Sequence, residues 1–246
     1  MATVNNDFYD GLGERWFEDD GHAIALLRAE GVLKTAYVRE VFERTGVRPG
    51  ARVLDVACGA GLVGLPLAAA GFRVHGVDLA AGALDVARRR VPPGAEATFA
   101  VADATRLPDA DGAYDAVLLL DMLEHVESVP AVLAEAARVV RPGGPVVFNT
   151  FNRTPLATLL AVHGFKFVTQ DAPAHVHVAR YFVPPASLRA QARYAGLRVE
   201  ETRGMRPRLD GAFWRSVARR RVDPAFRFTF QRSEAVGYIG YAVREA

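Results

Sequence analysis

The chain has 246 residues, of which 50% are hydrophobic and 24% are charged, a balance that excludes wholesale disorder and suits one large α/β domain. Its 30 basic residues barely exceed its 28 acidic residues, so the charge does not indicate a nucleic-acid-binding protein. Cys58 is the single cysteine, no signal peptide is recognisable, and no apolar stretch reaches the ~20 residues that cross a bilayer, so we expect a cytoplasmic protein.

Helices and strands are predicted to alternate after a helical N-terminal region. Two helices are expected first, at about 21–31 and 34–45. From residue 52 onward, short apolar runs predict strands and segments of helical periodicity lie between them. The predicted strands are 52–57, 73–77, 98–101, 114–120, 145–151, 197–202 and 235–244, and the predicted helices between them are 61–70, 80–91, 131–140 and 184–195.

The alternation predicts right-handed crossovers between parallel strands. The expected fold class is therefore α/β, with a Rossmann-like, seven-stranded, mostly parallel sheet and helices on both faces. Residues 1–48 are expected to form an N-terminal helical cap on a main domain of residues 49–246. Two insertions, at about 152–183 and 204–234, are predicted to be irregular, and long insertions of this kind are usually functional.

A glycine-rich loop follows the first predicted strand and opens a helix. Gly59, Gly61 and Gly64 match the dinucleotide pattern G-x-G-x-x-G, which is a weak signal alone. Asp78, at the end of the second strand, is suited to ribose hydroxyls. Asp55, at the end of the first strand, would repel a pyrophosphate but would attract an ammonium group or another cation. The pattern therefore disfavours a nicotinamide oxidoreductase.

Several motifs in this order resemble the class I S-adenosylmethionine-dependent methyltransferases. They are the loop DVACGAG, the step GVDLA, the ADA step at 102–104, YDAVLLLDMLEHV, and VVRPGG before the fifth strand. The resemblance implies that residues 49–246 are the methyltransferase domain and that the cofactor is S-adenosylmethionine. It implies cofactor contacts by Asp55, Ala57, Gly59 and Gly61 (methionine part), Asp78 and Leu79 (ribose side), Asp103 and Ala104 (adenine), and Leu120 (cofactor wall). Ala57 stands where many members have glycine.

A narrower set of motifs resembles the ubiquinone-biosynthesis O-methyltransferases, which methylate phenolic hydroxyls on polyprenylated rings. The motifs are DMLEHV at 121–126, FNTFNR at 148–153, the segment 177–185, and RWF at 15–17. The resemblance implies a small-molecule phenolic substrate on a lipophilic or quinone-like ring. It places Lys34 where that family has an arginine near the cofactor carboxylate, and Asp121 where the family typically has glutamate.

Three roles are open for the polar cluster after the fourth strand. A phenol has a pKa of about 10, so a base or a cation must help to remove its proton. His125 is the candidate base, with Glu124 orienting it or acting in its place. Alternatively, Asp121, Glu124 and His125 bind Mg²⁺, which would hold the phenolate oxygen. In the third interpretation, Glu124 caps a helix or pairs with an arginine while His125 packs.

The remaining candidates lie in the insertions. His175 and His177 flank Val176, so an extended segment would direct both toward the substrate, although a solvated loop is an equal alternative. Segment 155–168, if helical, is a core-facing lid or, less favoured, a peripheral membrane contact. A monomer and a homodimer are both open. The alternative functions are N- or C-methylation of a secondary metabolite and a non-catalytic cofactor-binding module that serves a partner enzyme.

Overall fold

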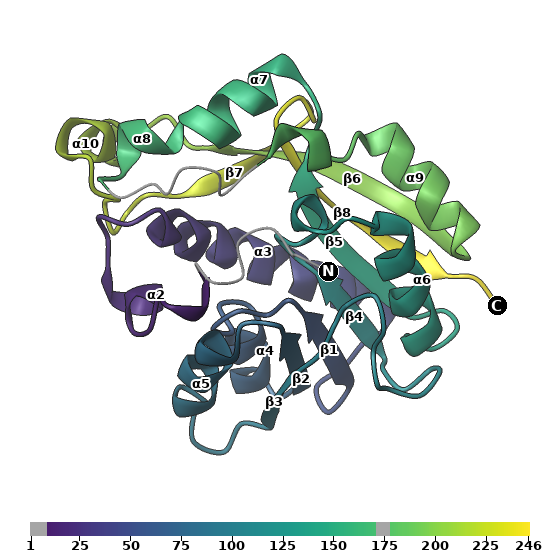
Figure 1. Cartoon of the computed structure of the whole chain (residues 1–246). Coiled ribbons are helices and arrows are strands. Elements are labelled where there is room, and N and C mark those ends of the chain that lie inside the picture. The colour runs from purple at the N-terminus through teal and green to yellow at the C-terminus, as the bar shows by residue number, and fades with distance from the viewer. Residues whose placement is uncertain (1–8, 171–177) are drawn as a thin grey trace.

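An eight-stranded mixed sheet forms the centre of the molecule (Figure 1). The computed structural model describes residues 9–170 and 178–246. The strand order is β3-β2-β1-β4-β5-β8-β6-β7, in which β1 to β5 are parallel and β8, β6 and β7 are joined to them by antiparallel pairing. The strands are β1 (Arg52–Val56), β2 (Arg73–Asp78), β3 (Ala97–Val101), β4 (Ala116–Leu119), β5 (Pro145–Phe151), β6 (Leu197–Pro207), β7 (Phe228–Gln231) and β8 (Gly237–Arg244).

Helices cover both faces of this sheet, as predicted. The longer helices are α3 (Ile24–Thr45), α5 (Ala81–Arg89), α6 (Val129–Val139), α9 (Pro185–Tyr194) and α10 (Gly211–Arg219), and the short ones are α2 (Arg15–Glu18), α4 (Gly64–Ala69), α7 (Pro155–Thr158) and α8 (Phe165–Val168). Alternate residues of the central strands enter different cores: Leu54 packs with α6 residues, whereas Val53 packs with α3 and α4 residues. Burial on both faces explains the unbroken apolar character of these strands.

The N-terminal region differs from the two predicted helices. α3 runs without a break through Gly31 and ends where Gly46 adopts a left-handed conformation (φ 73°). Gly31 is buried, and a Cβ there would lie 3.8 Å from the Leu62 Cβ, so this glycine allows close packing rather than ending the helix. Tyr37 and Phe42 of α3 belong to the same core as β1 and β4. The division into a cap and a main domain stays a prediction.

The insertion 204–234 contains regular structure, so the prediction that it is irregular is wrong. β6 continues past its expected end to Pro207, α10 follows, and β7 pairs with the far half of β6, which supplies the eighth strand. The Asp210 carboxylate accepts hydrogen bonds from the backbone N–H groups of Ala212 and Phe213, so it caps α10.

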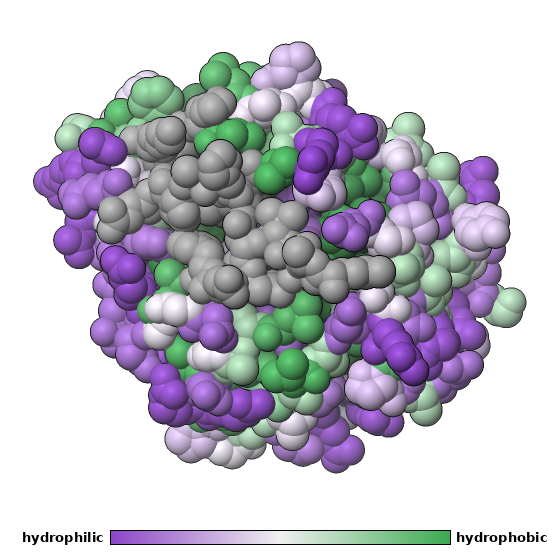
Figure 2. Space-filling model, in the orientation of Figure 1, coloured by the Kyte–Doolittle hydropathy of each residue, from purple (hydrophilic) through white to green (hydrophobic). Residues whose placement is uncertain are grey.

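The two insertions pack against each other at one end of the sheet. Val168 of α8 joins Phe213 and Phe226 of the second insertion in a small core that also contains Leu26 of α3. The segment from α7 to α8 is helical with a π-helical turn (Leu159–His163), and its Ala157 and Ala161 are buried. Large apolar side chains of the same segment are exposed, namely Leu156, Leu159, Leu160 and Phe167. Figure 2 shows hydrophobic (green) surface near the upper edge of the molecule, where Figure 1 shows α7. Among the described helices, none is long and apolar enough to span a bilayer.

Candidate active site

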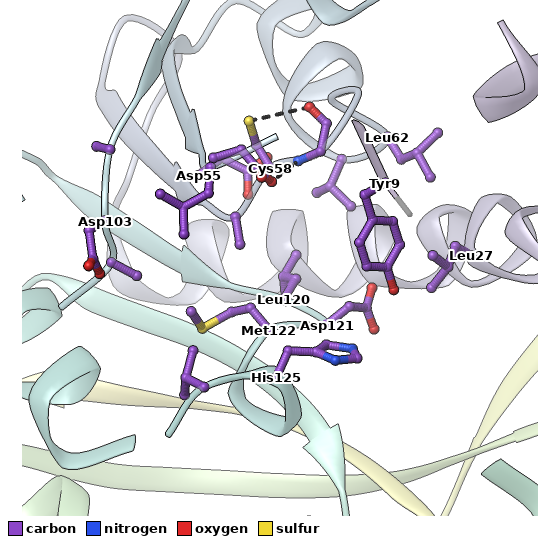
Figure 3. A pocket seen from close by; sticks show the side chains of 18 of the residues that line it. Tyr9, Leu27, Asp55, Cys58, Leu62, Asp103, Leu120, Asp121, Met122 and His125 are labelled. Carbon is purple, nitrogen blue, oxygen red and sulfur yellow. Dashed lines mark hydrogen bonds between the residues drawn. The ribbon is translucent and has the colours of Figure 1, made fainter. Parts of the chain in front are cut away.

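A cavity of about 420 Å³ opens at the carboxyl ends of β1, β2 and β4 (Figure 3). The strand order reverses direction between β1 and β4, and ligands of open α/β sheets bind at such a switch point. The residues that line the cavity are Tyr9, Trp16, Leu27, Gly31, Asp55, Ala57, Cys58, Gly59, Leu62, Val63, Asp78, Leu79, Ala102, Asp103, Ala104, Thr105, Leu120, Asp121, Met122, His125, Val126, Glu127 and Ser128.

The glycine-rich loop forms one side of this cavity. Ala57 has φ 57° and Gly59 has φ 52°, conformations that favour glycine, so the methyl group at position 57 is held at some conformational cost. The Gly59 N–H donates to Asp78 Oδ2 at 2.8 Å, and a Cβ at Gly59 would lie only 2.8 Å from the Trp16 ring. Gly61 does not line the cavity. A Cβ there would lie 2.9 Å from Leu65, so Gly61 serves the packing of α4 on the loop.

Asp55 and Asp78 form the β1–β2 wall of the cavity. Burial and the nearby Asp78 raise the pKa of Asp55 to about 7, although the Gly64 N–H partly offsets this. Burial also raises the pKa of Asp78, against the hydrogen bonds that it accepts from the Ala80 and Gly59 N–H groups. Among the described residues, neither carboxylate forms an ion pair with a cationic side chain. A cationic ligand would therefore stabilise the ionised form of both.

Asp103 and Ala104 lie at the exposed rim beyond β3. Asp103 accepts hydrogen bonds from the Thr105 N–H at 2.8 Å and the Thr105 hydroxyl at 2.7 Å, which hold its pKa below the usual range. Leu79 and Leu120 line the cavity between this rim and the loop. The structure thus brings together all the predicted cofactor residues except Gly61 and Lys34.

Lys34 does not line the cavity, and it neutralises two partly buried carboxylates. Its Nζ is 2.5 Å from both Oδ atoms of Asp121 and 2.7 Å from Glu30 Oε2, and its side chain is fully buried. Asn149 donates to Asp121 Oδ1 and accepts from the Asp121 N–H, both at 2.9 Å. Burial acts to raise the pKa of Asp121, but Lys34 and Asn149 outweigh it and lower that pKa. The predicted contact of Lys34 with the cofactor stays a prediction.

Asp121 and His125 belong to the β4 wall of the cavity, whereas Glu124, between them in the sequence, does not line it. Asp121 follows β4 with φ 54°, an uncommon conformation for a residue with a Cβ. His125 lies on the short 3₁₀ turn Leu123–His125 and faces the cavity, with its ring edge-on to Tyr9 at 6.2 Å between centroids. In Figure 3 the Tyr9 hydroxyl points toward Asp121 and His125. The cluster therefore presents an imidazole and a carboxylate to the cavity.

Glu124 is directed away from the cavity. Its Oε2 accepts a hydrogen bond from the Thr150 hydroxyl at 2.8 Å, and its Oε1 is buried with no hydrogen-bond partner in the described structure. Burial and the charge of Asp121 raise the pKa of Glu124 to about 8. Thr150, rather than an arginine, is its observed partner, which corrects that part of the third interpretation.

The predicted Mg²⁺ site is not supported by the arrangement of these side chains. Within residues 9–170 and 178–246, no group of three or more His, Cys, Asp or Glu side chains is placed to hold a metal ion. Asp121 is held by Lys34 and Glu124 by Thr150, so the two carboxylates do not converge with His125 on one point. His175 and His177, the predicted substrate contacts, lie outside the described residues.

The sequence predicted an N-terminal helical cap, but it did not identify which residues of this region line the cavity. Tyr9 and Trp16 stack at 5.8 Å between ring centroids, and Leu27 and Gly31 line the same side. No local motif marks these residues, since they lie far along the chain from the strands that they cover. The only signal was the resemblance of RWF at 15–17.

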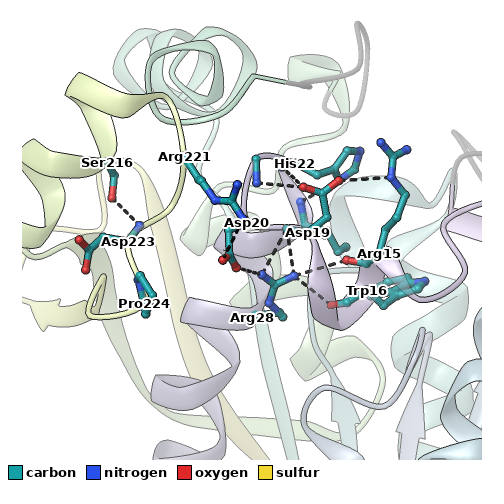
Figure 4. A network of polar contacts seen from close by, with 12 residues as sticks. Arg15, Trp16, Asp19, Asp20, His22, Arg28, Ser216, Arg221, Asp223 and Pro224 are labelled. Atoms are coloured by element: carbon teal, nitrogen blue, oxygen red, sulfur yellow. Dashed lines mark hydrogen bonds and ion pairs between the residues drawn. The ribbon is translucent and has the colours of Figure 1, made fainter.

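A network of polar contacts holds this covering segment in place (Figure 4). Arg28 of α3 donates to the Trp16 and Asp19 carbonyl oxygens and to Asp20 Oδ1 at 3.3, 3.2 and 2.5 Å. Arg221, from the second insertion, lies 3.6 Å from Asp20. The N-terminal segment is therefore tied both to α3 and to the insertion.

Comparisons with known proteins bear on this site. A family model described as a methyltransferase domain matches residues 54–148. The ubiquinone biosynthesis O-methyltransferase of Xanthomonas axonopodis pv. citri is 35% identical over 245 residues, which cover 97% of this chain and 92% of the relative. The protein of the same name from Bordetella avium is 35% identical over 206 residues, 81% of this chain and 82% of the relative.

Solved structures show the same fold. The magnesium protoporphyrin IX methyltransferase of Synechocystis PCC 6803, solved with bound S-adenosylhomocysteine (SAH), has a TM-score of 0.66 and 23% identity, and 98% of each chain is covered. A possible histamine N-methyltransferase from Thermotoga maritima has a TM-score of 0.59 and 18% identity, again with 98% of each chain covered.

Proposed function

This chain belongs to the ubiquinone biosynthesis O-methyltransferase family and is an S-adenosylmethionine-dependent O-methyltransferase, and from that premise we propose that it methylates a phenolic hydroxyl on a small, lipophilic, quinone-like ring. The observation that carries the proposal is the cavity at the β1/β4 switch point, where an acidic wall faces a wall that carries a histidine. When bound, S-adenosylmethionine supplies an electrophilic methyl group on its sulfonium.

The residues of the cavity fit this cofactor. Asp55 and Asp78 are buried without a cation, which suits a ligand that carries an ammonium and a sulfonium charge. In the proposal, the loop at Ala57 and Gly59 lies along the methionine part and Asp78 accepts from the ribose hydroxyls. Asp103 and Ala104 hold the adenine, while Leu79 and Leu120 supply apolar walls.

His125 is proposed to remove the phenolic proton. Its imidazole lines the cavity, and a neutral imidazole can accept a proton near neutral pH. Glu124 is assigned a supporting role, because its carboxyl does not line the cavity and accepts a hydrogen bond from Thr150. The proposal assigns proton removal to His125 rather than to Mg²⁺, since Asp121 and Glu124 already have protein partners.

The apolar face of the α7–α8 segment supports a lipophilic acceptor. Leu156, Leu159 and Phe167 are exposed there, although the opposite side of the segment packs into the protein. Such a face would favour a lipophilic substrate. It would also favour a peripheral contact with the membrane in which that substrate dissolves.

A screen with a radiolabelled methyl donor tests the proposal. Catechols, hydroquinones and amines of similar size would be compared as acceptors, and calorimetry would compare SAH with NADH. We expect label on the hydroxylated rings and binding of SAH. Transfer to amines alone would favour an N-methyltransferase, and absence of transfer to every acceptor with tight SAH binding would favour the cofactor-binding module.

A further inference from the structure

Tyr9 connects the glycine-rich loop with the proposed base. On one side, its ring stacks on Trp16 at 5.8 Å between ring centroids, and the Trp16 ring packs directly on Gly59. On the other side, it meets the His125 ring at 6.2 Å between centroids, with 78° between the ring planes. Both separations lie within the range of aromatic pairs that attract each other. A row of contacts therefore runs from the cofactor loop to His125.

The place of Tyr9 is fixed by contacts on the loop side of the cavity. The next residue, Asp10, accepts a hydrogen bond through its Oδ1 from the Gly82 N–H at 2.6 Å, at the start of α5. Tyr9 itself packs against the small core that joins the N-terminal segment to α5. His125, in contrast, belongs to the turn that follows β4. Tyr9 is thus held independently of the turn that it contacts.

His125 needs such a support because it lies on a short turn. The 3₁₀ turn Leu123–His125 has three residues, and its Leu123 side chain is buried whereas the imidazole faces the cavity. A general base must come within about 2.6–3.2 Å of the oxygen whose proton it takes, and a displacement of about 1 Å can slow turnover about 100-fold. The rate therefore depends on how firmly the imidazole is oriented.

Tyr9 is suited to orient this imidazole and not to replace it as the base. In Figure 3 the Tyr9 side chain is directed toward Asp121 and His125. Burial and the charges of Asp121 and Glu124 raise the pKa of Tyr9, so its hydroxyl stays protonated at the pH where a histidine accepts a proton. Tyr9 is therefore a neutral ring beside the base.

We propose that Tyr9 is a positioning residue, which holds the His125 imidazole in place through the contact between the two rings. The inference rests on the proposed function, in which His125 removes the phenolic proton. The Tyr9 ring limits rotation of the imidazole and fixes its distance from the loop along which the methionine part of the cofactor lies. Because Tyr9 acts through His125, its loss should slow turnover and change cofactor affinity little.

Turnover of two Tyr9 variants tests the inference. We expect Tyr9→Leu, which removes the ring, to lower kcat for a phenol by about 10- to 100-fold, with the Kd of SAH within about twofold of wild type. Tyr9→Phe keeps the ring and should recover most of the turnover. Tyr194→Leu is the matched control, because Tyr194 lies on α9 and is 93% exposed. Equal losses in the two Tyr9 variants, or full turnover by Tyr9→Leu, would overturn the inference.

A double-mutant cycle separates positioning from a merely structural role. In the His125→Ala background, residual methyl transfer is followed with the radiolabelled donor. Adding Tyr9→Leu should lower it by less than about twofold, since no imidazole remains to be positioned. Losses that multiply would show that Tyr9 acts independently of His125 and would overturn the inference. A wild-type protein that methylates no phenol would instead contradict the proposed function.

Discussion

The two walls of the cavity hold buried carboxylates in opposite ways. On the β1–β2 wall, Asp55 and Asp78 receive backbone N–H groups but no cation, and burial raises both pKa values. On the β4 wall, Asp121 receives the ammonium of Lys34 and the amide of Asn149, and its pKa is lowered. The first wall is suited to a ligand that brings positive charge, whereas the second is neutralised by the protein itself.

The difference separates binding from chemistry. On the β1–β2 wall, the ionised carboxylates are stabilised when a ligand brings positive charge, so this wall contributes to binding affinity. A wall whose charge is compensated internally can hold His125 in a constant environment whether or not a ligand is present. Four experiments test whether the two walls have these separate roles.

Removal of the internal cation should have the largest effect, and it falls on stability. Lys34→Met leaves the partly buried Asp121 and Glu30 without a counter-charge, so we expect the free energy of unfolding to fall by about 3 kcal/mol in urea denaturation. Arg39→Met, at an exposed position of the same helix, is the control. Adding Asp121→Asn to Lys34→Met should restore part of the loss. Equal stability of the two single variants would show that the β4 wall is not neutralised by Lys34.

Removal of the proposed base should affect turnover alone. We expect His125→Ala to lower kcat for a phenol by about 100- to 1,000-fold, since general-base catalysis contributes rates of this order. The Kd of SAH should stay within about twofold of wild type, because the carboxylates proposed to contact the cofactor, Asp55 and Asp78, lie on the other wall. His75→Ala is the control, as His75 bonds to Thr98 on β3 and does not line the cavity. Full turnover by His125→Ala would remove it from the mechanism.

Loss of a charge from the β1–β2 wall should affect binding alone. Asp78→Asn keeps the shape of the side chain but weakens its acceptance from Gly59 and Ala80, and we expect SAH to bind about 10- to 100-fold more weakly. Asp85→Asn, on the exposed side of α5, should leave the affinity unchanged. A loss of turnover at saturating cofactor, with unchanged affinity, would contradict the separation of the walls.

The smallest effect should be the pH dependence of binding. Asp55 has a pKa of about 7, so it is mostly neutral at pH 6 and mostly ionised at pH 8. Because the ionised form attracts the ammonium group, SAH should bind about tenfold more tightly at pH 8 than at pH 6. Asp55→Asn should flatten that profile in calorimetry. A profile of the same slope in the variant would assign the titration to another group.

The local parts of the site were predictable from the sequence. A short-range pattern predicted the strand, glycine-rich loop and helix at 52–70. The same kind of pattern placed an acid at or just after the ends of three strands, namely Asp55, Asp78 and Asp103. Glycines that allow a tight turn and apolar runs that indicate a strand buried on both faces are both visible in short stretches of sequence. The sequence therefore determined the α/β fold and most of the cavity's lining.

Only the tertiary structure decided which side chains neutralise the buried charges, which residues cover the cavity and how the edge strands pair. Lys34 pairs with Asp121, which lies 87 positions further along the chain. The Trp16 ring packs on the glycine-rich loop, which begins about forty positions later. β7 pairs with the part of β6 that extends beyond its predicted end. A local pattern does not encode such partners, because the pKa of a buried carboxyl and the pairing of an edge strand depend on which distant segments burial brings within a few ångströms.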